Sequence, residues 1–188
     1  MNTGIIRDGI ASILEHLGFD LEDPNFVDTP RRVALVWMNE FCQPTLKGLG
    51  EIITVFPEKH DQMIIISNHT CWTRCPHHLE RVKLKVSIGY LQGEEHLVVG
   101  ASKLPRIADY FAKTLTMQET LTDTIANAID HYLKPKGVGV HIVGQHHCMC
   151  ARGVESDGVM LTTALRGNFL LDGVKTEFLE ACRYKHSF

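Results

Sequence analysis

The sequence predicts an α+β fold in which helices pack on one face of an antiparallel sheet. Two helical patterns come first, strand patterns follow, and a pair of helical patterns separates the first strands from the last. Connections of hairpin length between successive strands favour antiparallel pairing over a parallel array with crossover helices. We expect one domain, because the 188 residues contain no internal repeat, low-complexity tract or linker rich in Pro, Gly or Ser.

The first two helices are expected near the N-terminus. Apolar residues recur at helical spacing over residues 6–17, and Gly18 follows as a C-terminal cap. Asp28 stands two residues before Pro30, the pattern of a capping residue followed by Pro in the first helical turn. The second helix then continues with apolar residues on one face over 33–41.

The middle of the chain alternates apolar and polar residues, as half-buried strands do. In residues 81–90 the even positions are apolar and most odd positions are polar. The apolar runs 63–66 and 96–99 are predicted to be the neighbours of this strand in the sheet.

Helical spacing returns over residues 102–115 and 121–132. A strand is then expected to start at residue 138 and to run into residues 146–150. The predicted remainder is a closing hairpin of residues 159–165 and 169–171, followed by a short helix over 175–184.

Composition excludes several classes of protein. The sequence has 19 Lys and Arg against 22 Asp and Glu, a formal charge of -3, which argues against a generally basic nucleic-acid binder. No apolar run approaches the roughly 20 residues of a membrane helix, and the first residues do not resemble a signal peptide. We therefore expect a cytoplasmic protein, whose six cysteines are better explained as reduced thiols or metal ligands than as disulfides.

Cys and His residues are concentrated in two short segments, 71–78 and 146–150. In the first segment, Cys75 and His78 stand three residues apart. Pro76 between them favours an extended Cys75 and can open a helical turn, so that both side chains reach one point. This is the spacing of metal ligands.

The second segment adds ligands if its strand continues, because His146, Cys148 and Cys150 then share one face. Thiolate and imidazole are the preferred ligands of Zn²⁺, and two Cys plus one His with an open fourth position form a catalytic set. A structural site of four thiolates, from Cys71, Cys75, Cys148 and Cys150, is an alternative. Simple core packing of Cys148 and Cys150 is another.

Several separated motifs resemble the GTP cyclohydrolase I family in order and spacing. They are Cys75-Pro76-His77-His78, the run from Ser102 to Ile107, Gln118-Glu119, and the run from His146 to Gly153. The resemblance extends from about residue 29 to about residue 179. It implies a single catalytic domain over 1–188, with an N-terminal helical part of about 1–60 and a tunnelling-fold core of about 61–188.

In the tunnelling fold, sheets from several subunits join into a barrel. The resemblance therefore implies a homo-oligomer, typically a decamer of two pentameric rings, with active sites at subunit interfaces. The implied substrate is GTP, and the implied products are formate and 7,8-dihydroneopterin triphosphate, a first step toward pterin, folate or deazaguanine compounds.

The resemblance implies that Cys75, His78 and Cys148 bind zinc and leave the fourth position for water. Zinc lowers the pKa of such a water to about 7, which gives a hydroxide to attack C8 of the guanine ring. His77 and His146 match the acid and base groups of the family, a role that suits imidazoles because their pKa lies near the working pH.

The family pattern also implies substrate contacts. Gln118 and Glu119 match substrate-binding positions, and the Glu119 carboxylate would accept from N1–H and the 2-amino group of guanine. Thr116 and Glu119 also have the spacing of a capping box, which would give Glu119 a purely structural role. The residues that match groups around the triphosphate are Ser102, Lys103, Arg106 and Arg152, with Arg32 supplied by a neighbouring subunit.

Three residues depart from the family pattern. Pro76 stands where glutamate is common, and Leu35 and Cys150 stand where some members have lysines near the phosphates. These departures motivate one alternative to the enzyme, a nucleotide- or pterin-binding homologue without turnover. A further alternative, of another class, is a structural zinc protein that works by protein contacts.

Overall fold

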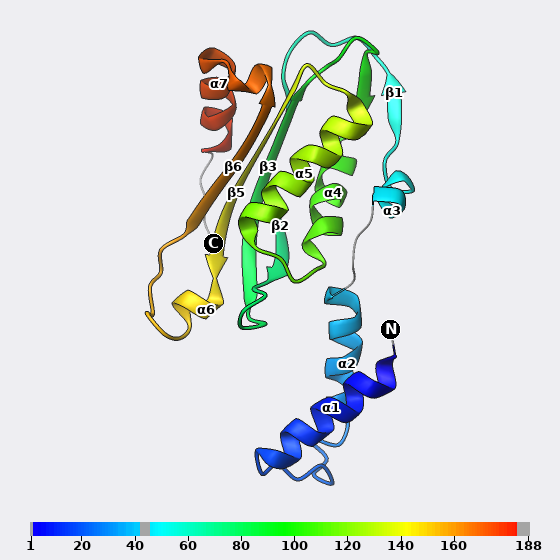
Figure 1. Cartoon of the computed structure of the whole chain (residues 1–188), viewed down its shortest axis with the longest axis vertical. Helices are drawn as coiled ribbons and strands as arrows, with labels where there is room; N and C mark the ends of the chain where they lie inside the picture. The colour runs from blue at the N-terminus through cyan, green and yellow to red at the C-terminus, as the bar shows by residue number, and fades with distance from the viewer. Residues whose placement is uncertain (1, 42–45, 184–188) are drawn as a thin grey trace. The chain divides into compact units, whose positions relative to one another are not determined.

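A computed structural model describes residues 2–41 and 46–183. The chain divides into two compact units, Met1–Gln43 and Pro44–Phe188. Nowhere in the described ranges is a helix long and apolar enough to cross a membrane. Figure 1 shows the helices of the first unit and the sheets and helices of the second.

The N-terminal unit consists of two helices, α1 (Thr3–His16) and α2 (Thr29–Glu40). Gly18 adopts φ +86 just after α1, where its amide donates to the Glu15 carbonyl at 2.9 Å. Only a residue without a Cβ takes this conformation easily. The predicted first helix and its glycine cap are therefore confirmed.

Asp28 is the N-cap residue of α2, but its side chain makes no capping hydrogen bond. Its carboxylate instead accepts from Arg31 at 2.6 Å and from Arg32 at 3.0 Å. The pKa of Asp28 is lowered by the hydrogen bond from Arg31, with a smaller contribution from Arg32. The predicted side-chain cap is therefore wrong, because two guanidinium groups compete successfully for the carboxylate.

The second unit is built on a four-stranded antiparallel sheet with the strand order β2-β3-β5-β6. Its strands are β2 (Ile64–Arg74), β3 (Arg81–Leu91), β5 (Gly137–His146) and β6 (Met160–Gly167). In β3 the even positions are buried, as the alternating pattern predicts.

A separate two-stranded sheet pairs β1 (Val55–Pro57) with β4 (Leu97–Val99). The prediction that residues 96–99 neighbour β3 in the sheet is wrong, because β2 and β5 occupy both edges of β3. Contact between β3 and β4 is made by a side chain instead: the Val99 amide donates to the Tyr90 hydroxyl at 3.1 Å.

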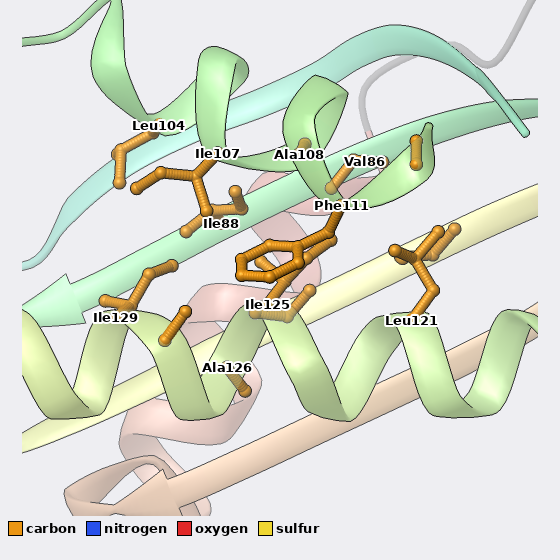
Figure 2. Close-up of a cluster of buried hydrophobic side chains, with 14 of the residues drawn as sticks. Val86, Ile88, Leu104, Ile107, Ala108, Phe111, Leu121, Ile125, Ala126 and Ile129 are labelled. Carbon is orange, nitrogen blue, oxygen red and sulfur yellow. The ribbon is translucent and has the colours of Figure 1, made fainter. Parts of the chain in front are cut away.

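Two helices, α4 (Lys103–Ala112) and α5 (Gln118–Leu133), cover one face of the large sheet. Their apolar side chains meet over β3, as Figure 2 shows for Phe111, Ile125 and Ile88. Each of these side chains is at most 4% exposed. The main core therefore lies between the sheet and these two helices, and the α+β class with an antiparallel sheet is confirmed.

The last helix, α7 (Asp172–Cys182), packs on the opposite face of the sheet. There Phe178 would lie 3.0 Å from a Cβ at Gly89, and Phe169 would lie 2.4 Å from a Cβ at Gly139. The two glycines, paired across β3 and β5, provide the space for these rings. The helices of the core are thus not all on one face.

Three short helices complete the second unit: α3 (Leu46–Gly50), α6 (His147–Cys150) and the 3-10 helix η1 (Asn168–Leu170). The predicted strand through 146–150 is wrong, because β5 ends at His146 and the chain turns helical. The predicted hairpin of 159–165 with 169–171 is also wrong, because β6 pairs with β5 and η1 follows it.

Candidate metal centre

The loop between β2 and β3 holds the first two candidate ligands. The Cys75 amide donates to the Glu80 carbonyl, and the Leu79 amide donates to the Cys75 carbonyl, both at 2.9 Å. Leu79 has φ +57, which tightens the turn further. This loop brings the Sγ of Cys75 to 3.6 Å from the Nδ1 of His78.

The third ligand comes from the end of β5. His146 pairs with Val82 at the start of β3, so α6 begins beside the loop that carries Cys75. Within the first turn of α6, Cys148 points toward this loop. The ligand atoms of Cys75, His78 and Cys148 lie within 4.8 Å of one another, and the described parts of the chain contain no second group of three that meets this criterion.

The donor set fits zinc. Tetrahedral Zn–S and Zn–N bonds of about 2.3 and 2.1 Å place a sulfur and a nitrogen about 3.6 Å apart, and the Cys75 Sγ to His78 Nδ1 distance is 3.6 Å. Cys75 is buried, Cys148 is half-buried and His78 is exposed. The cluster is thus closed on the protein side and open toward solvent, as expected for a centre with a free fourth position.

The alternative of four thiolates has no support in this geometry. Cys71 lies in the main core at 3% exposure, where burial, and to a lesser extent the Asp109 carboxylate, raises the pKa of its thiol to about 12. Cys150 lies in α6 but outside the three-residue cluster. Since residues 147–150 are helical, the predicted strand face shared by His146, Cys148 and Cys150 does not form.

Burial raises the pKa of the Cys148 thiol, and the neighbouring Cys75 raises it further, whereas the positive charge of Arg152 opposes the shift. Without a cation, Cys148 is therefore a protonated thiol at neutral pH. Binding a divalent metal requires its thiolate and releases the proton. Arg152 itself is exposed and lies close enough to act on this thiol.

Two imidazoles flank the cluster. His77 is exposed, and its Nδ1 lies 3.9 Å from the Cys75 sulfur. His146, the last residue of β5, places its Nε2 3.0 Å from the Oε1 of Gln118. Burial lowers the pKa of His146, while the Glu119 carboxylate acts in the opposite direction. His146 is therefore a neutral imidazole at pH 7, beside the cluster and able to take up a proton.

Glu119 is exposed in the first turn of α5. The capping box predicted from Thr116 does not form, because the helix has Met117 as its N-cap and no side chain caps it. The Thr116 hydroxyl donates to the Met117 carbonyl instead, at 3.3 Å. The Glu119 carboxylate is thus not engaged in a cap and remains available to a ligand.

Of the predicted phosphate-binding residues, Arg152 lies near Cys148, but Ser102, Lys103 and Arg106 lie elsewhere in this chain. Lys103 and Arg106 line a pocket of about 370 Å³ along α4, and Ser102 precedes the helix. The metal centre adjoins the other end of α4, where the Thr73 hydroxyl donates to the Thr114 carbonyl at 3.1 Å. A helix of ten residues such as α4 is about 15 Å long, and Ser102 and Lys103 stand at its start.

Arg32 belongs to the N-terminal unit, where its Nε donates to the Asp28 carboxylate at 3.0 Å. The second unit thus brings together His77, His146, Gln118, Glu119 and Arg152 around the three candidate ligands. It does not bring Ser102, Lys103 and Arg106 to the same place.

Three residues behind His146 were not predicted from the sequence: Thr122, Gly144 and Thr162. They pack around the side chain of Gln118, which is 2% exposed and bonded to Thr162. A glycine inside a strand signals a close approach of another group, so Gly144 was the available clue. Gln118 itself was predicted to bind substrate, whereas its amide is fully engaged inside the protein.

A family model and two relatives similar in sequence indicate the same family. A sequence model of GTP cyclohydrolase I matches residues 6–183. The GTP cyclohydrolase 1 of Saccharomyces cerevisiae is 36% identical over 179 residues, which cover 93% of this chain and 72% of the relative. The GTP cyclohydrolase 1 of Wolinella succinogenes is also 36% identical, over 95% of this chain and 96% of its own.

Proposed function

The chain belongs to the GTP cyclohydrolase I family, and on that premise we propose that it converts GTP to 7,8-dihydroneopterin triphosphate and formate at a zinc centre. The observation that carries the zinc assignment is the convergence of three donor atoms, from Cys75, His78 and Cys148, within 4.8 Å of one another. Two thiolates, one imidazole and an open side are the donor set of catalytic zinc.

Bound zinc would supply a Lewis acid and a source of hydroxide at neutral pH. The residues of the chain then hold the guanine and move protons. His77, on the solvent side of the cluster, is placed to exchange a proton with the imidazole ring of guanine. His146, neutral because burial lowers its pKa, is placed to accept one. Opening and reclosing a ring require several such transfers, which imidazoles perform well near pH 7.

Glu119 is proposed to select guanine. Its carboxylate is free of the helix cap and lies close enough to His146 to act on its charge. An ionised carboxylate can accept two hydrogen bonds at once, from N1–H and from the 2-amino group. Adenine lacks this pair of donors and would leave the carboxylate without these two hydrogen bonds.

The triphosphate is proposed to bind between subunits. Ser102, Lys103 and Arg106 belong to the start and the second turn of α4, whereas the metal centre adjoins the end of this helix, which is about 15 Å long. We infer that they serve the metal centre of a neighbouring copy, together with Arg32, and that Arg152 binds phosphate beside its own Cys148. The enzyme is then a homo-oligomer, and a decamer of two pentameric rings is the proposed form.

Thiolate ligands stay available to zinc only in a reducing compartment, which favours the cytoplasm as the place of action. The departures at Pro76, Leu35 and Cys150 leave both histidines and all three donors in place. The departures are therefore compatible with turnover. The absence of the two lysines would mainly lower the affinity for the triphosphate.

Incubation of the zinc-loaded protein with GTP tests the proposal. The expected result is equimolar release of formate and a pterin product, seen by its ultraviolet absorbance and fluorescence. Nucleotide binding without formate would mean a homologue without turnover. Zinc binding with no effect of GTP on the melting temperature would mean a structural zinc protein. Either outcome would contradict the proposed activity.

A further inference from the structure

Both the nitrogen and the oxygen of the Gln118 side-chain amide have hydrogen-bond partners within the protein. Its Nε2 lies 3.2 Å from the Ile142 carbonyl, 3.0 Å from the Met160 carbonyl and 3.1 Å from the Thr162 hydroxyl. Its Oε1 lies 3.0 Å from the Nε2 of His146. These four contacts join the start of α5 to β5 and β6.

The hydrogen-bonding groups around Gln118 determine the positions of its side-chain oxygen and NH₂ group. Two of them are backbone carbonyls, which only accept, so the NH₂ group of Gln118 must face them. The Thr122 hydroxyl donates to the Gln118 carbonyl at 2.7 Å, so the 2.7 Å contact between Thr122 and Thr162 takes its hydrogen from Thr162. The Thr162 oxygen then accepts from Gln118. A flipped amide would set its oxygen against two carbonyl oxygens.

The tautomer of His146 follows from this orientation. Because Oε1 of Gln118 only accepts, the Nε2 of His146 must carry a hydrogen and donate it. A neutral imidazole has one N–H, so its other nitrogen, Nδ1, carries the lone pair. Nδ1 has no hydrogen-bond partner among residues 2–41 and 46–183, so it is left to a ligand.

Gly144 makes this arrangement possible. A Cβ at position 144 would lie 2.0 Å from the Oε1 of Gln118 and 2.9 Å from its Cδ. No side chain fits at that distance, so any larger residue would displace the amide from His146. A glycine in the middle of β5 weakens a strand, and the close approach of Gln118 is the structural reason for it here.

We infer that Gln118 is a positioning residue: it holds His146 in the Nε2–H tautomer and thereby makes Nδ1 the atom that exchanges protons with the substrate. This inference rests on the proposed function, in which His146 is an acid and base group. In the proton-accepting step, the substrate N–H or O–H bond breaks, its hydrogen binds to Nδ1, and the electron pair stays on the substrate. The Nε2–H bond to Gln118 persists, and the same Nδ1 later returns the proton.

Neutron diffraction from deuterated, zinc-loaded crystals at alkaline pH, where the imidazole is neutral, tests the tautomer directly. The expected map has deuterium on Nε2 of His146 and none on Nδ1. Deuterium on Nδ1 with a bare Nε2 would overturn the inference. This measurement does not depend on turnover, so a protein inactive on GTP would refute the proposed function and leave the tautomer assignment intact.

Kinetics of two variants test the positioning role. Gln118→Met keeps the length of the side chain without its hydrogen bonds, and Gly144→Ala displaces the amide without changing Gln118. Both are expected to bind zinc and to lower kcat by about 10-fold to 100-fold, with KM within about twofold, as losses of such supporting contacts do. Thr163→Val, on the opposite face of β6, is the control and should keep normal kinetics.

A rise in KM with unchanged kcat in Gln118→Met would instead mean that Gln118 contacts the substrate, and it would overturn the inference. Should Gly144→Ala fail to fold, Thr162→Val provides a milder variant, since it removes one of the three acceptors around the Gln118 amide. Thr162→Val is expected to lower kcat less than Gln118→Met does. The positioning role would be contradicted if both variants had the kcat of the unmodified protein.

Discussion

The two ends of α4 use their polar side chains in opposite ways. At the metal end, Cys75 and Gln118 are buried, and Gln118 makes four hydrogen bonds. At the other end, Ser102 and Arg106 are exposed, and within the described residues no hydrogen bond or ion pair engages the side chain of Lys103 or Arg106. The polar groups at one end are thus hydrogen-bonded within the chain, whereas the cations at the other end are exposed or half-buried and have no such bonds among the described residues.

The difference reflects two tasks: holding catalytic groups in a fixed geometry at the metal end, and binding the triphosphate at the cation end. Groups that touch reacting atoms must be held closely, and buried hydrogen bonds hold them. Cations that bind a triphosphate need only be near it, because charge-assisted contacts act over a longer range and tolerate solvent. Substitutions at the metal end should therefore lower turnover, and those at the cation end should weaken binding.

The largest effect is expected at the metal. Cys148→Ser should lose bound zinc and at least about 1,000-fold of turnover, because Lewis-acid catalysis contributes several kcal/mol. Metal analysis beside the GTP assay measures both. Cys150→Ser is the matched control from the same helix, and loss of zinc in that variant as complete as in Cys148→Ser would contradict the three-ligand centre.

His77→Ala should keep zinc and nucleotide binding but lose turnover by about 100-fold to 10,000-fold, the usual contribution of an acid or base group. Steady-state assays of the zinc-loaded variant measure the effect. His131→Ala, an exposed histidine at the end of α5, is the control. Normal turnover of His77→Ala would remove His77 from the proposed mechanism.

Glu119→Gln should lose guanine recognition, because an amide accepts one of the two hydrogens and presents its own NH₂ to the other. In the proposed complex guanine covers Glu119 and buries the pairing, and loss of such a charged pairing costs about 2 to 5 kcal/mol, a fall of roughly 30-fold to several thousand-fold in kcat/KM. The melting temperature should not change, since Glu119 does not cap α5. Glu180→Gln, exposed on α7, controls for the charge change.

The smallest effect is expected at the cation end. Arg106→Ala should raise the KM for GTP by about 10-fold to 100-fold with little change in kcat, as the loss of one charged contact of about 1.5 to 3 kcal/mol predicts. Lys175→Ala on α7 is the control for a lost surface cation. A fall in kcat without a change in KM would mean that Arg106 acts near the reacting ring. It would contradict the assignment of binding to the cation end and turnover to the metal end.

Periodicity predicted the elements but not all of their partners. The strand over 81–90 and the helix over 102–115 are correct, because alternation and helical spacing are local properties of the chain. The pairing of 96–99 is wrong, because the occupants of the edges of β3 depend on residues far away in sequence. The end of β5 at His146 was missed for a related reason: α6 forms where Cys148 turns toward the loop of Cys75.

In the candidate site, too, features formed by neighbouring residues were predictable, and features that depend on distant residues were not. The spacing of Cys75 and His78 predicted a metal site, because both lie in one short loop. The capping box from Thr116 to Glu119 matched its pattern but did not form, since helix α5 begins one residue later, after Met117. The engagement of Gln118 was not visible in the sequence, because its partners come from β5 and β6.

Co-expression of two variants that are each impaired at low GTP tests the division of the site between subunits most directly. His77→Ala chains carry an intact cation end, and Arg106→Ala chains carry an intact metal end. If neighbouring copies share each site, random mixing gives about one site in four with both ends intact, so the mixed oligomer should recover about a quarter of normal activity at low GTP. Activity no higher than the mean of the two separate variants would show that each chain builds its whole site alone, and would contradict the shared site.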